Sequence, residues 1–316
     1  MGHFLHAVGV FFHHLAVVRW DMLGLAIACH VAKLAFRSYA WRAIVAAAYP
    51  GARLKLRSVF GAYVAGVGVN SIVPARGGDL VKLYLVKHRV EGGAYATLAP
   101  TLVVETLFDF VTGAALLAWA LAIGVLPAHQ VYSRIPDVDW KFFLRHERLT
   151  LFLLAGLAVG GLVLFVWARR RWDDFKERVG RGFAILRDRS RFFWRVIVPQ
   201  AISWVLRIAS VFFFLKAFHV PATVHNALLV QVVDSLSTLF PATPGGAGTK
   251  QGLTEFLFRG RGVPHTLLLA FSVGMNIAIV VANVVLGLIA MALMARTLSF
   301  KRLRMASRAE QSASAP

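Results

Sequence analysis

The sequence has few charged residues for its length, few acidic residues, and a single cysteine. Charged side chains make up 16% of the 316 residues, whereas soluble domains average about 25%. The lone cysteine, Cys29, excludes an intrachain disulfide. No stretch is both long enough and polar enough to form a separate soluble catalytic domain. The chain is therefore predicted to be an integral membrane protein.

The sequence also lacks the motifs of common catalytic and cofactor sites. It contains no Ser-His-Asp constellation, HExxH zinc motif, Walker loop or GxGxxG fingerprint. Four histidines stand near the start, at His3, His6, His13 and His14, but no Cys or carboxylate lies nearby to complete a metal site. We therefore expect no enzyme activity, no metal and no cofactor.

Apolar residues dominate what is present, and basic residues greatly outnumber acidic ones. Hydrophobic residues make up 58% of the chain, and its net charge is +20, from 35 basic and 15 acidic residues. In a soluble protein this charge would indicate nucleic-acid binding. Here the basic residues cluster between apolar segments, as expected for contact with anionic lipid headgroups and for cytoplasmic loops. Nucleic acid is thus not an expected partner.

The apolar segments predict an all-α membrane protein. Segments long enough to cross about 30 Å of hydrocarbon lie at residues 21–48, 94–126, 149–168, 196–218 and 265–295. Residues 1–18 are too short to cross and are predicted to form an interfacial amphipathic helix. Two further apolar segments, 58–86 and 221–258, are interrupted by proline and glycine. Each is predicted to form a re-entrant helical hairpin.

The basic clusters predict one orientation and an internal repeat. Residues 169–195 hold ten basic and four acidic residues and are predicted to form a basic cytoplasmic helix, preceded by the linking span within 127–195. This choice also places the basic tail, 296–316, in the cytoplasm. Residues 19–126 and 196–295 then each contain a span, a hairpin and a span. The two units have inverted topology, as in many secondary transporters.

Three motifs carry a family resemblance. They are NSIVPARGGDLVKLYL (residues 70–85), VVETLFDF (103–110) and PATPGGAGTKQG (241–252). Together they resemble the lysylphosphatidylglycerol synthase transmembrane region, also called the flippase-like domain family, over roughly residues 15–295. The resemblance implies a multi-pass protein of a bacterial inner membrane that handles lipids across the bilayer.

Two features of the sequence depart from the family pattern. Thr106 stands where the family has arginine, and Gln251 stands where it has glutamate; Glu255, one turn further on, is a candidate to compensate. Some family members carry a soluble aminoacyl-transferase domain. These 316 residues contain no such domain, so synthase activity is expected to be absent.

The glycine-rich interruptions predict an anion site. Paired glycines leave the backbone free of side chains, and exposed N–H groups at broken helices attract anions. The neighbouring cations Arg76, Lys82 and Lys250 are predicted to bind a lipid phosphate between the two hairpins. The alternative is that Arg76 and Lys82 extend to the interface or pair with Asp79.

Acidic residues within the apolar segments need partners. Glu105 and Asp109 are four residues apart and share one helix face, which should point into the bundle because a lipid-exposed acid costs roughly 3 kcal/mol. They are interpreted either as a substrate-amine or proton site or as structural partners of Arg76, Lys82 or Arg207. Asp234 is expected to pair with Arg207 or with a charge of the first half.

The sequence thus defines a candidate site and three candidate functions. The first is a lipid translocase, a flippase or scramblase that works without ATP on an anionic or aminoacylated phospholipid or a polyprenyl-phosphate-linked lipid. The second is a non-transporting accessory protein of a lipid or terpenoid (hopanoid-like) pathway, and the third is a membrane enzyme acting on headgroups. Expected partners are membrane lipids, chiefly anionic; a second copy of the chain and a lipid-biosynthesis enzyme are candidates as well. The candidate substrate-binding residues are Asn70, Arg76, Gly77, Gly78, Asp79, Lys82, Glu105, Asp109, Arg207, Asp234, Gly245, Gly246, Lys250, Gln251 and Glu255.

Overall fold

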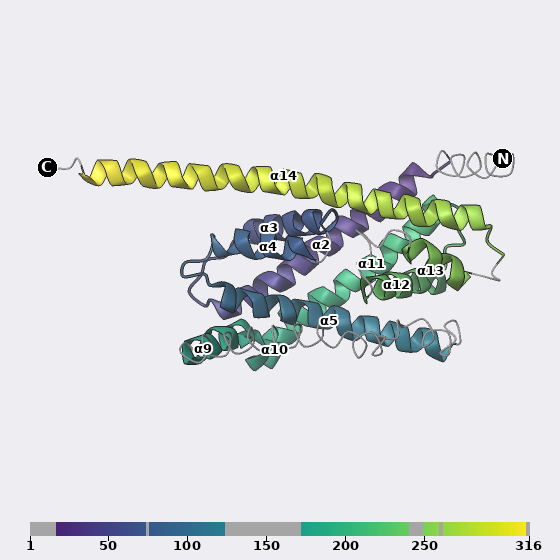
Figure 1. Cartoon of the computed structure of the whole chain (residues 1–316), viewed down its shortest axis with the longest axis horizontal. Coiled ribbons are helices and arrows are strands. Elements are labelled where there is room, and N and C mark those ends of the chain that lie inside the picture. Colours follow the sequence, from purple (N-terminus) through teal and green to yellow (C-terminus); the bar gives the residue numbers. More distant parts are fainter. Residues whose placement is uncertain (1–16, 74–75, 124–171, 240–248, 259–261, 314–316) are drawn as a thin grey trace, which may run out of the picture.

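The structure is a computed structural model that describes residues 17–73, 76–123, 172–239, 249–258 and 262–313 (Figure 1). Every regular element among these residues is a helix, and none of them forms a strand, which confirms the all-α prediction. The helices of the first half are α2 (Trp20–Ala48), α3 (Leu56–Asn70), α4 (Gly77–Lys87) and α5 (Tyr95–Ala122).

The second half begins with a series of short helical segments. They are α9 (Trp172–Gly182), η1 (Ala184–Arg187), α10 (Arg189–Phe192) and η2 (Phe193–Ile197). The remaining helices are α11 (Val198–Ala217), α12 (Val224–Leu239), α13 (Thr249–Phe258) and α14 (His265–Ala313). Three predicted segments lie outside the described residues. They are residues 1–16 of the interfacial helix, the span at 149–168, and residues 240–248 of the second glycine-rich interruption.

Three helical stretches are long and apolar enough to cross a membrane, counting only the described residues. They are Tyr95–Ala122, Arg189–Ala217 and His265–Met294. Helix α2 has 29 residues and so has the length to cross, but it carries His30, Lys33 and Arg37 within its apolar sequence. The membrane assignment from the sequence is therefore confirmed for three helices, and the crossing by α2 stays a prediction.

The two halves share one order of helix lengths: long, short, short, long. The short helices α3 and α4 have 15 and 11 residues, and α12 and α13 have 16 and 10. At about 1.5 Å per residue, none of these four reaches across roughly 30 Å of hydrocarbon. Helices α3 and α4 pack against each other as a hairpin. The re-entrant path of this hairpin in the membrane stays a prediction.

The first helices of the two halves pack side by side in opposite directions. The backbone N–H of Arg19, just before α2, donates to the carbonyl of Ala217 at the end of α11 (3.0 Å). Further along, the Ser210 hydroxyl donates to the carbonyl of Ala26 (2.8 Å). Figure 1 shows these two helices crossing the middle of the molecule, with α5 and α14 along opposite edges.

The other contacts between the halves are also reciprocal. Helix α3 packs on α14, and α12 packs on α5, so the first short helix of each half lies against the last helix of the other. At the first contact, a Cβ on Gly68 would lie 2.9 Å from the Cα of Gly287. At the second, Gly113 faces Ser235, with the serine hydroxyl 3.6 Å from the position of a Cβ. Small residues allow such close helix packing within membranes.

One group of helix ends gathers at one end of the molecule. Besides the Arg19–Ala217 bond, Nε2 of His219 donates to the carbonyl of Val17 (3.0 Å). The rings of Trp119, near the end of α5, and His225, at the start of α12, lie 5.4 Å apart. The predicted topology assigns all of these ends to the outer face.

The helix ends that are predicted to be cytoplasmic lie close together at the opposite end of the molecule. The backbone N–H of Ala94 donates to the hydroxyl of Tyr49 (2.9 Å), which joins the start of α5 to the end of α2. The guanidinium of Arg89 donates to the carbonyl of Met294 (3.4 Å), and α9 packs against α5. The basic segments that were assigned to one face therefore lie near one another.

Two predicted boundaries differ from the structure. The basic segment 169–195 is not one helix, because Asp188 caps a new helix by accepting from the backbone N–H of Arg191 (2.9 Å), and this helix continues through η2 into α11. Helix α14 does not end near Ala295 but continues to Ala313. No glycine or proline interrupts the sequence between these two residues, which is consistent with a continuous helix.

The apolar core consists of two clusters, and polar side chains lie between them. One cluster contains Trp41 and Ile44 of α2, and the other contains Phe214 of α11 and Phe271 of α14. Helices α2 and α5 contribute apolar residues to both clusters. Lys33 of α2 and both Glu105 and Asp109 of α5 lie between those contributions in the sequence. We call this region the polar zone. It contains the charged side chains of Lys33, Arg37, Lys82, Glu105, Asp109, Arg207, Asp234 and Lys250.

Candidate functional site

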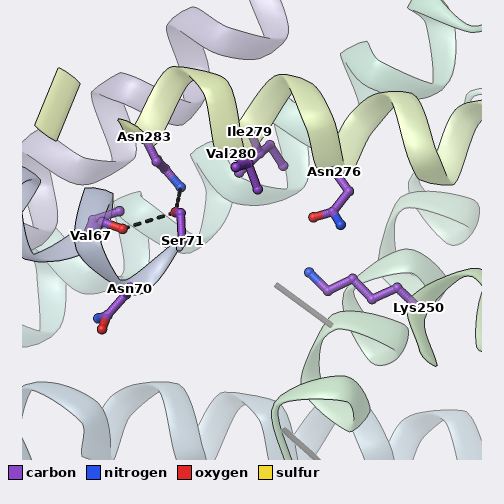
Figure 2. A pocket seen from close by; sticks show the side chains of 8 residues that line it. All are labelled: Val67, Asn70, Ser71, Lys250, Asn276, Ile279, Val280 and Asn283. Atoms are coloured by element: carbon purple, nitrogen blue, oxygen red, sulfur yellow. Dashed lines mark hydrogen bonds between the residues drawn. The ribbon is translucent and has the colours of Figure 1, made fainter. Parts of the chain in front are cut away.

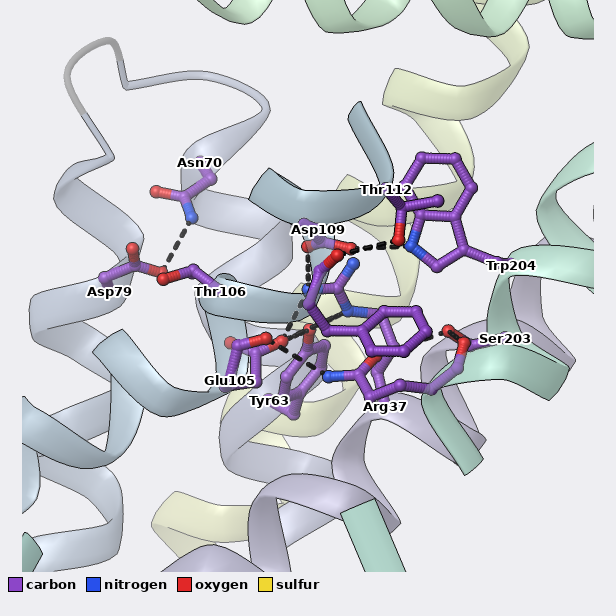
Figure 3. A network of polar contacts seen from close by, with 12 residues as sticks. Arg37, Tyr63, Asn70, Asp79, Glu105, Thr106, Asp109, Thr112, Ser203 and Trp204 are labelled. Carbon is purple, nitrogen blue, oxygen red and sulfur yellow. Dashed lines mark hydrogen bonds and ion pairs between the residues drawn. The ribbon is translucent and has the colours of Figure 1, made fainter. Parts of the chain in front are cut away.

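A buried ion-pair network joins the first half of the molecule at Glu105 of α5. Its carboxylate is 2% exposed. One oxygen accepts from the guanidinium of Arg37 (2.6 Å) and from the hydroxyl of Tyr63 (2.8 Å), as Figure 3 shows. The other oxygen accepts from the ammonium of Lys82 (3.2 Å). This network, with Asp109, is called the Arg37 network below.

Asp109 extends the Arg37 network toward the second half. One of its oxygens accepts from the Arg37 guanidinium, and the other accepts from the indole N–H of Trp204 on α11 (3.0 Å). The network therefore links α2, α3, α4, α5 and α11. Two cations and two carboxylates balance in charge, which is the condition under which buried ions are tolerated.

The network answers the question of how the α5 acids are paired. Of the three cations left open as partners of these acids, Lys82 pairs with Glu105, whereas Arg76 and Arg207 pair with other residues. Arg37 was not singled out from the sequence. Its position within the predicted span 21–48 could have indicated a role, because an arginine in a membrane span needs a partner in the bundle.

The first glycine-rich interruption holds α3 and α4 together. The backbone N–H of Gly78 donates to the side-chain carbonyl of Asn70 (2.7 Å), and the Asn70 amide donates to Asp79 (3.2 Å). Arg76 is 68% exposed, pairs with Asp79 (3.3 Å), and has the left-handed backbone conformation with φ 59°. The interruption lies between Asn70, the last residue of α3, and Gly77, which is the first residue of α4. The strain at the bend lies at Arg76.

A second cluster of charges lies in the second half around Asp234 of α12. Its carboxylate is 16% exposed and accepts from the ammonium of Lys250 on α13 (3.0 Å) and pairs with Arg207 on α11 (3.6 Å). Of the two alternatives left open for Asp234, the structure shows the pairing with Arg207. Lys33 of α2 lies within electrostatic range of Arg207 and Asp234. These four residues are called the Asp234 cluster below.

A hydrogen-bond chain connects α2, α14 and α3 beside this cluster. The buried ring of His30 lies 2.8 Å from the side-chain oxygen of Asn283. The Asn283 amide donates to the hydroxyl of Ser71 (3.0 Å), which donates to the carbonyl of Val67 (3.1 Å). Neither His30 nor Asn283 was among the predicted site residues.

This chain borders a cavity of about 260 Å³ between the two halves. Figure 2 shows the Lys250 and Asn276 side chains extending into the same space from α13 and α14. We call this space the amide-lined cavity, because three asparagines line it. Its lining residues are Val67, Asn70, Ser71, Lys250, Asn276, Ile279, Val280 and Asn283.

The structure places the remaining predicted site residues as follows. The three predicted phosphate-binding cations pair with three different carboxylates: Arg76 with Asp79, Lys82 with Glu105, and Lys250 with Asp234. Glu255 pairs with His265 at the start of α14 (2.7 Å), and Gln251 is half-buried on α13, so compensation by Glu255 stays a prediction. Gly245 and Gly246 lie outside the described residues. A substrate role for these residues stays a prediction.

No group of three or more His, Cys, Asp or Glu side chains suited to a metal ion occurs in the part of the chain that the structure describes. What the arrangement offers is charge and hydrogen bonding: two ion-pair clusters and an amide-lined cavity, all in the polar zone. Both halves contribute to this zone.

The fold and the site together define a helical membrane protein with a charged centre. The chain belongs to the family described as "Lysylphosphatidylglycerol synthase TM region", whose model matches residues 6–287. That family model covers a membrane domain. Comparisons with curated proteins and with solved structures found no match.

Proposed function

We propose that the protein translocates membrane lipids without ATP, passing the headgroup through the polar zone while the acyl chains stay in the bilayer. The observation that carries this proposal is the amide-lined cavity beside two charged clusters, built from both halves. Charged residues within membrane-spanning segments commonly mark substrate pathways. Transporters with inverted repeats bind substrate where the repeats meet, near the bilayer midplane.

The packing of the halves supports an inverted repeat. Helices α2 and α11 are antiparallel, and the α3–α14 contact mirrors the α12–α5 contact. Arg37 and Arg207 each lie near the middle of their long helix, and each binds a carboxylate of its own half. Such correspondence is expected when a two-fold axis lies in the membrane plane.

The translocase proposal predicts lipid movement in liposomes. Purified protein in phosphatidylcholine liposomes should raise the flip rate of a fluorescent anionic phospholipid by roughly tenfold or more, which equals a barrier lower by about 1.4 kcal/mol. The rate is measured as loss of fluorescence when an impermeant reductant is added outside. Wild-type protein that leaves the rate at the protein-free value would favour the accessory function.

A pair of tryptophan variants on α14 tests the route. Asn276→Trp fills the amide-lined cavity and should return the flip rate to near the protein-free value. Leu288→Trp adds the same side chain at a position that is 58% exposed on the same helix, and should leave the rate unchanged. Equal rates in the two variants would show that headgroups do not pass through this cavity.

We further propose that the basic ends face the cytoplasm. In a Cys29→Ala background, single cysteines at Lys55, Lys87 and Arg181 should resist an impermeant thiol reagent in intact cells, because all three lie at the basic end. A cysteine at the exposed Thr223 should react. Labelling at Lys87 without labelling at Lys55 would mean that α3 and α4 together cross the membrane, which rules out the re-entrant hairpin.

A further inference from the structure

Three polar side chains form a stripe along α2. His30, Lys33 and Arg37 are spaced by three and four residues, which places them on one face of the helix. His30 is hydrogen-bonded to Asn283, and Asn283 lines the amide-lined cavity (Figure 2). Lys33 belongs to the Asp234 cluster of the second half, and Arg37 belongs to the Arg37 network of the first. The stripe therefore leads from the cavity to both charged clusters.

Lys33 is the cation of this zone whose charge can change at the least cost. It is half-buried, and it forms no ion pair or hydrogen bond with the described residues. The charged groups near it on other helices are Arg207 of α11, Asp109 of α5 and Asp234 of α12, and both carboxylates are already paired with an arginine. Guanidinium groups do not release protons in proteins. Lys33 can therefore relieve the repulsion from Arg37 and Arg207 by becoming a neutral amine, whereas the two arginines cannot.

His30 supplies a proton acceptor one helical turn from Lys33. Its ring is 3% exposed, and its Nε2 lies 2.8 Å from the side-chain oxygen of Asn283. Because an amide oxygen only accepts, Nε2 carries the hydrogen of this bond, and Nδ1 of the neutral ring is then an acceptor. Nδ1 has no hydrogen-bond partner among the described residues. Since Lys33 lies within electrostatic range of this ring, the pair is suited to exchange a proton.

The amide-lined cavity gives this pair a route to water. Asn283 joins the two, because it binds His30 and also lines the cavity. The cavity has a volume of about 260 Å³ and a polar lining, and a water molecule occupies about 30 Å³ in the liquid. A polar space of this size holds several water molecules, which can accept and donate protons within the polar zone.

We propose that Lys33 is a proton-exchange site that couples lipid translocation to a proton gradient. When the proton leaves, an N–H bond of the Lys33 ammonium breaks and its electron pair stays on the nitrogen. Nδ1 of His30 accepts the proton with its own lone pair and then releases it to water. The reverse steps return a proton to Lys33. The proposal rests on the translocase function for the lipid, but not for the proton exchange.

The charge of Lys33 also predicts the direction of coupling. Protonated Lys33 offsets the negative charge of a lipid phosphate in the zone, whereas the neutral amine does not. The lipid anion should therefore cross when Lys33 is protonated, so that proton and lipid move in the same direction. A proton gradient should then drive the lipid into the leaflet on the less acidic side.

A pH gradient across liposomes tests this coupling. Proteoliposomes carry a trace of fluorescent phosphatidylglycerol, and their lumen is set one pH unit below the outside. One proton per lipid should enrich the probe in the outer leaflet by up to roughly tenfold, because one pH unit is a tenfold ratio of proton activity. The amplitude of the rapid bleaching phase after adding an impermeant reductant gives the outer fraction. Equal leaflets or enrichment in the inner leaflet would overturn the proposal.

Variants at Lys33 test the assignment of the proton site. Lys33→Arg keeps the charge but cannot release a proton, so its leaflets should stay equal. Lys33→Met, which removes the charge, should give equal leaflets as well, so the result does not depend on how arginine fits. Lys216→Arg makes the same change at an exposed position of α11 and should keep the wild-type enrichment. Wild-type enrichment in Lys33→Arg would overturn the assignment to Lys33.

A variant at His30 tests the relay. His30→Gln keeps a donor for Asn283 but has no ring nitrogen to accept a proton. The probe should approach its final distribution roughly tenfold more slowly, as for loss of a proton-transfer group worth about 1.4 kcal/mol of barrier. A wild-type rate in His30→Gln would remove His30 from the route.

A pH-sensitive dye trapped in the lumen separates the two proposals. The gradient should decay faster with wild-type protein than with Lys33→Arg. Equal decay in the two would refute proton exchange at Lys33, whatever the lipid does. Faster decay without any lipid flipping would refute the translocase function alone, whereas flipping that leaves the leaflets equal would refute the coupling alone.

Discussion

Replacing Arg37 with methionine is expected to lower the free energy of unfolding by about 3–5 kcal/mol, the cost of removing one partner from a buried ion pair. Glu105 keeps Lys82 as a cation, but Asp109 loses the only cation it binds among the described residues. The result is an unpaired carboxylate that is 25% exposed. The loss is measured as a lower midpoint of denaturant or thermal unfolding in detergent, followed by tryptophan fluorescence.

Two further variants separate loss of pairing from loss of side-chain volume. The double variant Arg37→Met/Asp109→Asn leaves no unpaired charge, since Lys82 still pairs with Glu105, and it should recover a large part of the lost stability. Arg19→Met breaks an exposed pair with Asp21 next to the same helix and should change the midpoint little. If Arg37→Met is no less stable than Arg19→Met, the network does not hold the helices together.

Replacing Gly78 with alanine is expected to separate α3 from α4 and to cost about 3 kcal/mol or more, at the upper end for overpacked cores. A Cβ at this position would lie 1.9 Å from the backbone oxygen of Gly66 and 2.8 Å from the backbone nitrogen of Asn70. Backbone atoms of a packed helix cannot move aside as a flexible side chain can. The variant should express poorly or unfold at a markedly lower temperature.

The matched control is Gly252→Ala on α13. A Cβ at Gly252 meets nothing within 4 Å, so this change should be neutral or stabilise the helix by up to about 1 kcal/mol. Similar unfolding temperatures for the two variants would contradict the close contact between α3 and α4.

Helix positions were predictable where apolar length and helix breakers agree. The segment 249–258 coincides with α13, and the predicted span 21–48 coincides with α2 to within one residue. Prediction was wrong at 169–195, where charge alone indicated one helix. The cap at Asp188 is a local hydrogen bond, and in a sequence dense with charges nothing distinguishes it from other aspartates.

The need for ion pairs was predictable, but their partners were not all predictable. The cost of an unpaired charge in a membrane requires that Glu105 and Asp234 be paired. Arg37 lies 68 residues from Glu105, and whether the two meet depends on how α2 packs against α5. For the same reason the sequence did not single out Lys33 of α2, which lies within electrostatic range of Arg207 and Asp234.

The sequence by itself determined that this protein is helical and belongs in a membrane, because apolar segments in lipid must satisfy every backbone hydrogen bond within themselves. It also determined which segments are interrupted, since proline and glycine act locally. Only the tertiary structure decided which charges pair and where a cavity remains. The amide-lined cavity exists because α3 of one half packs against α14 of the other, where Gly68 and Gly287 allow close approach. That contact joins residues more than 200 positions apart, and no local pattern specifies it.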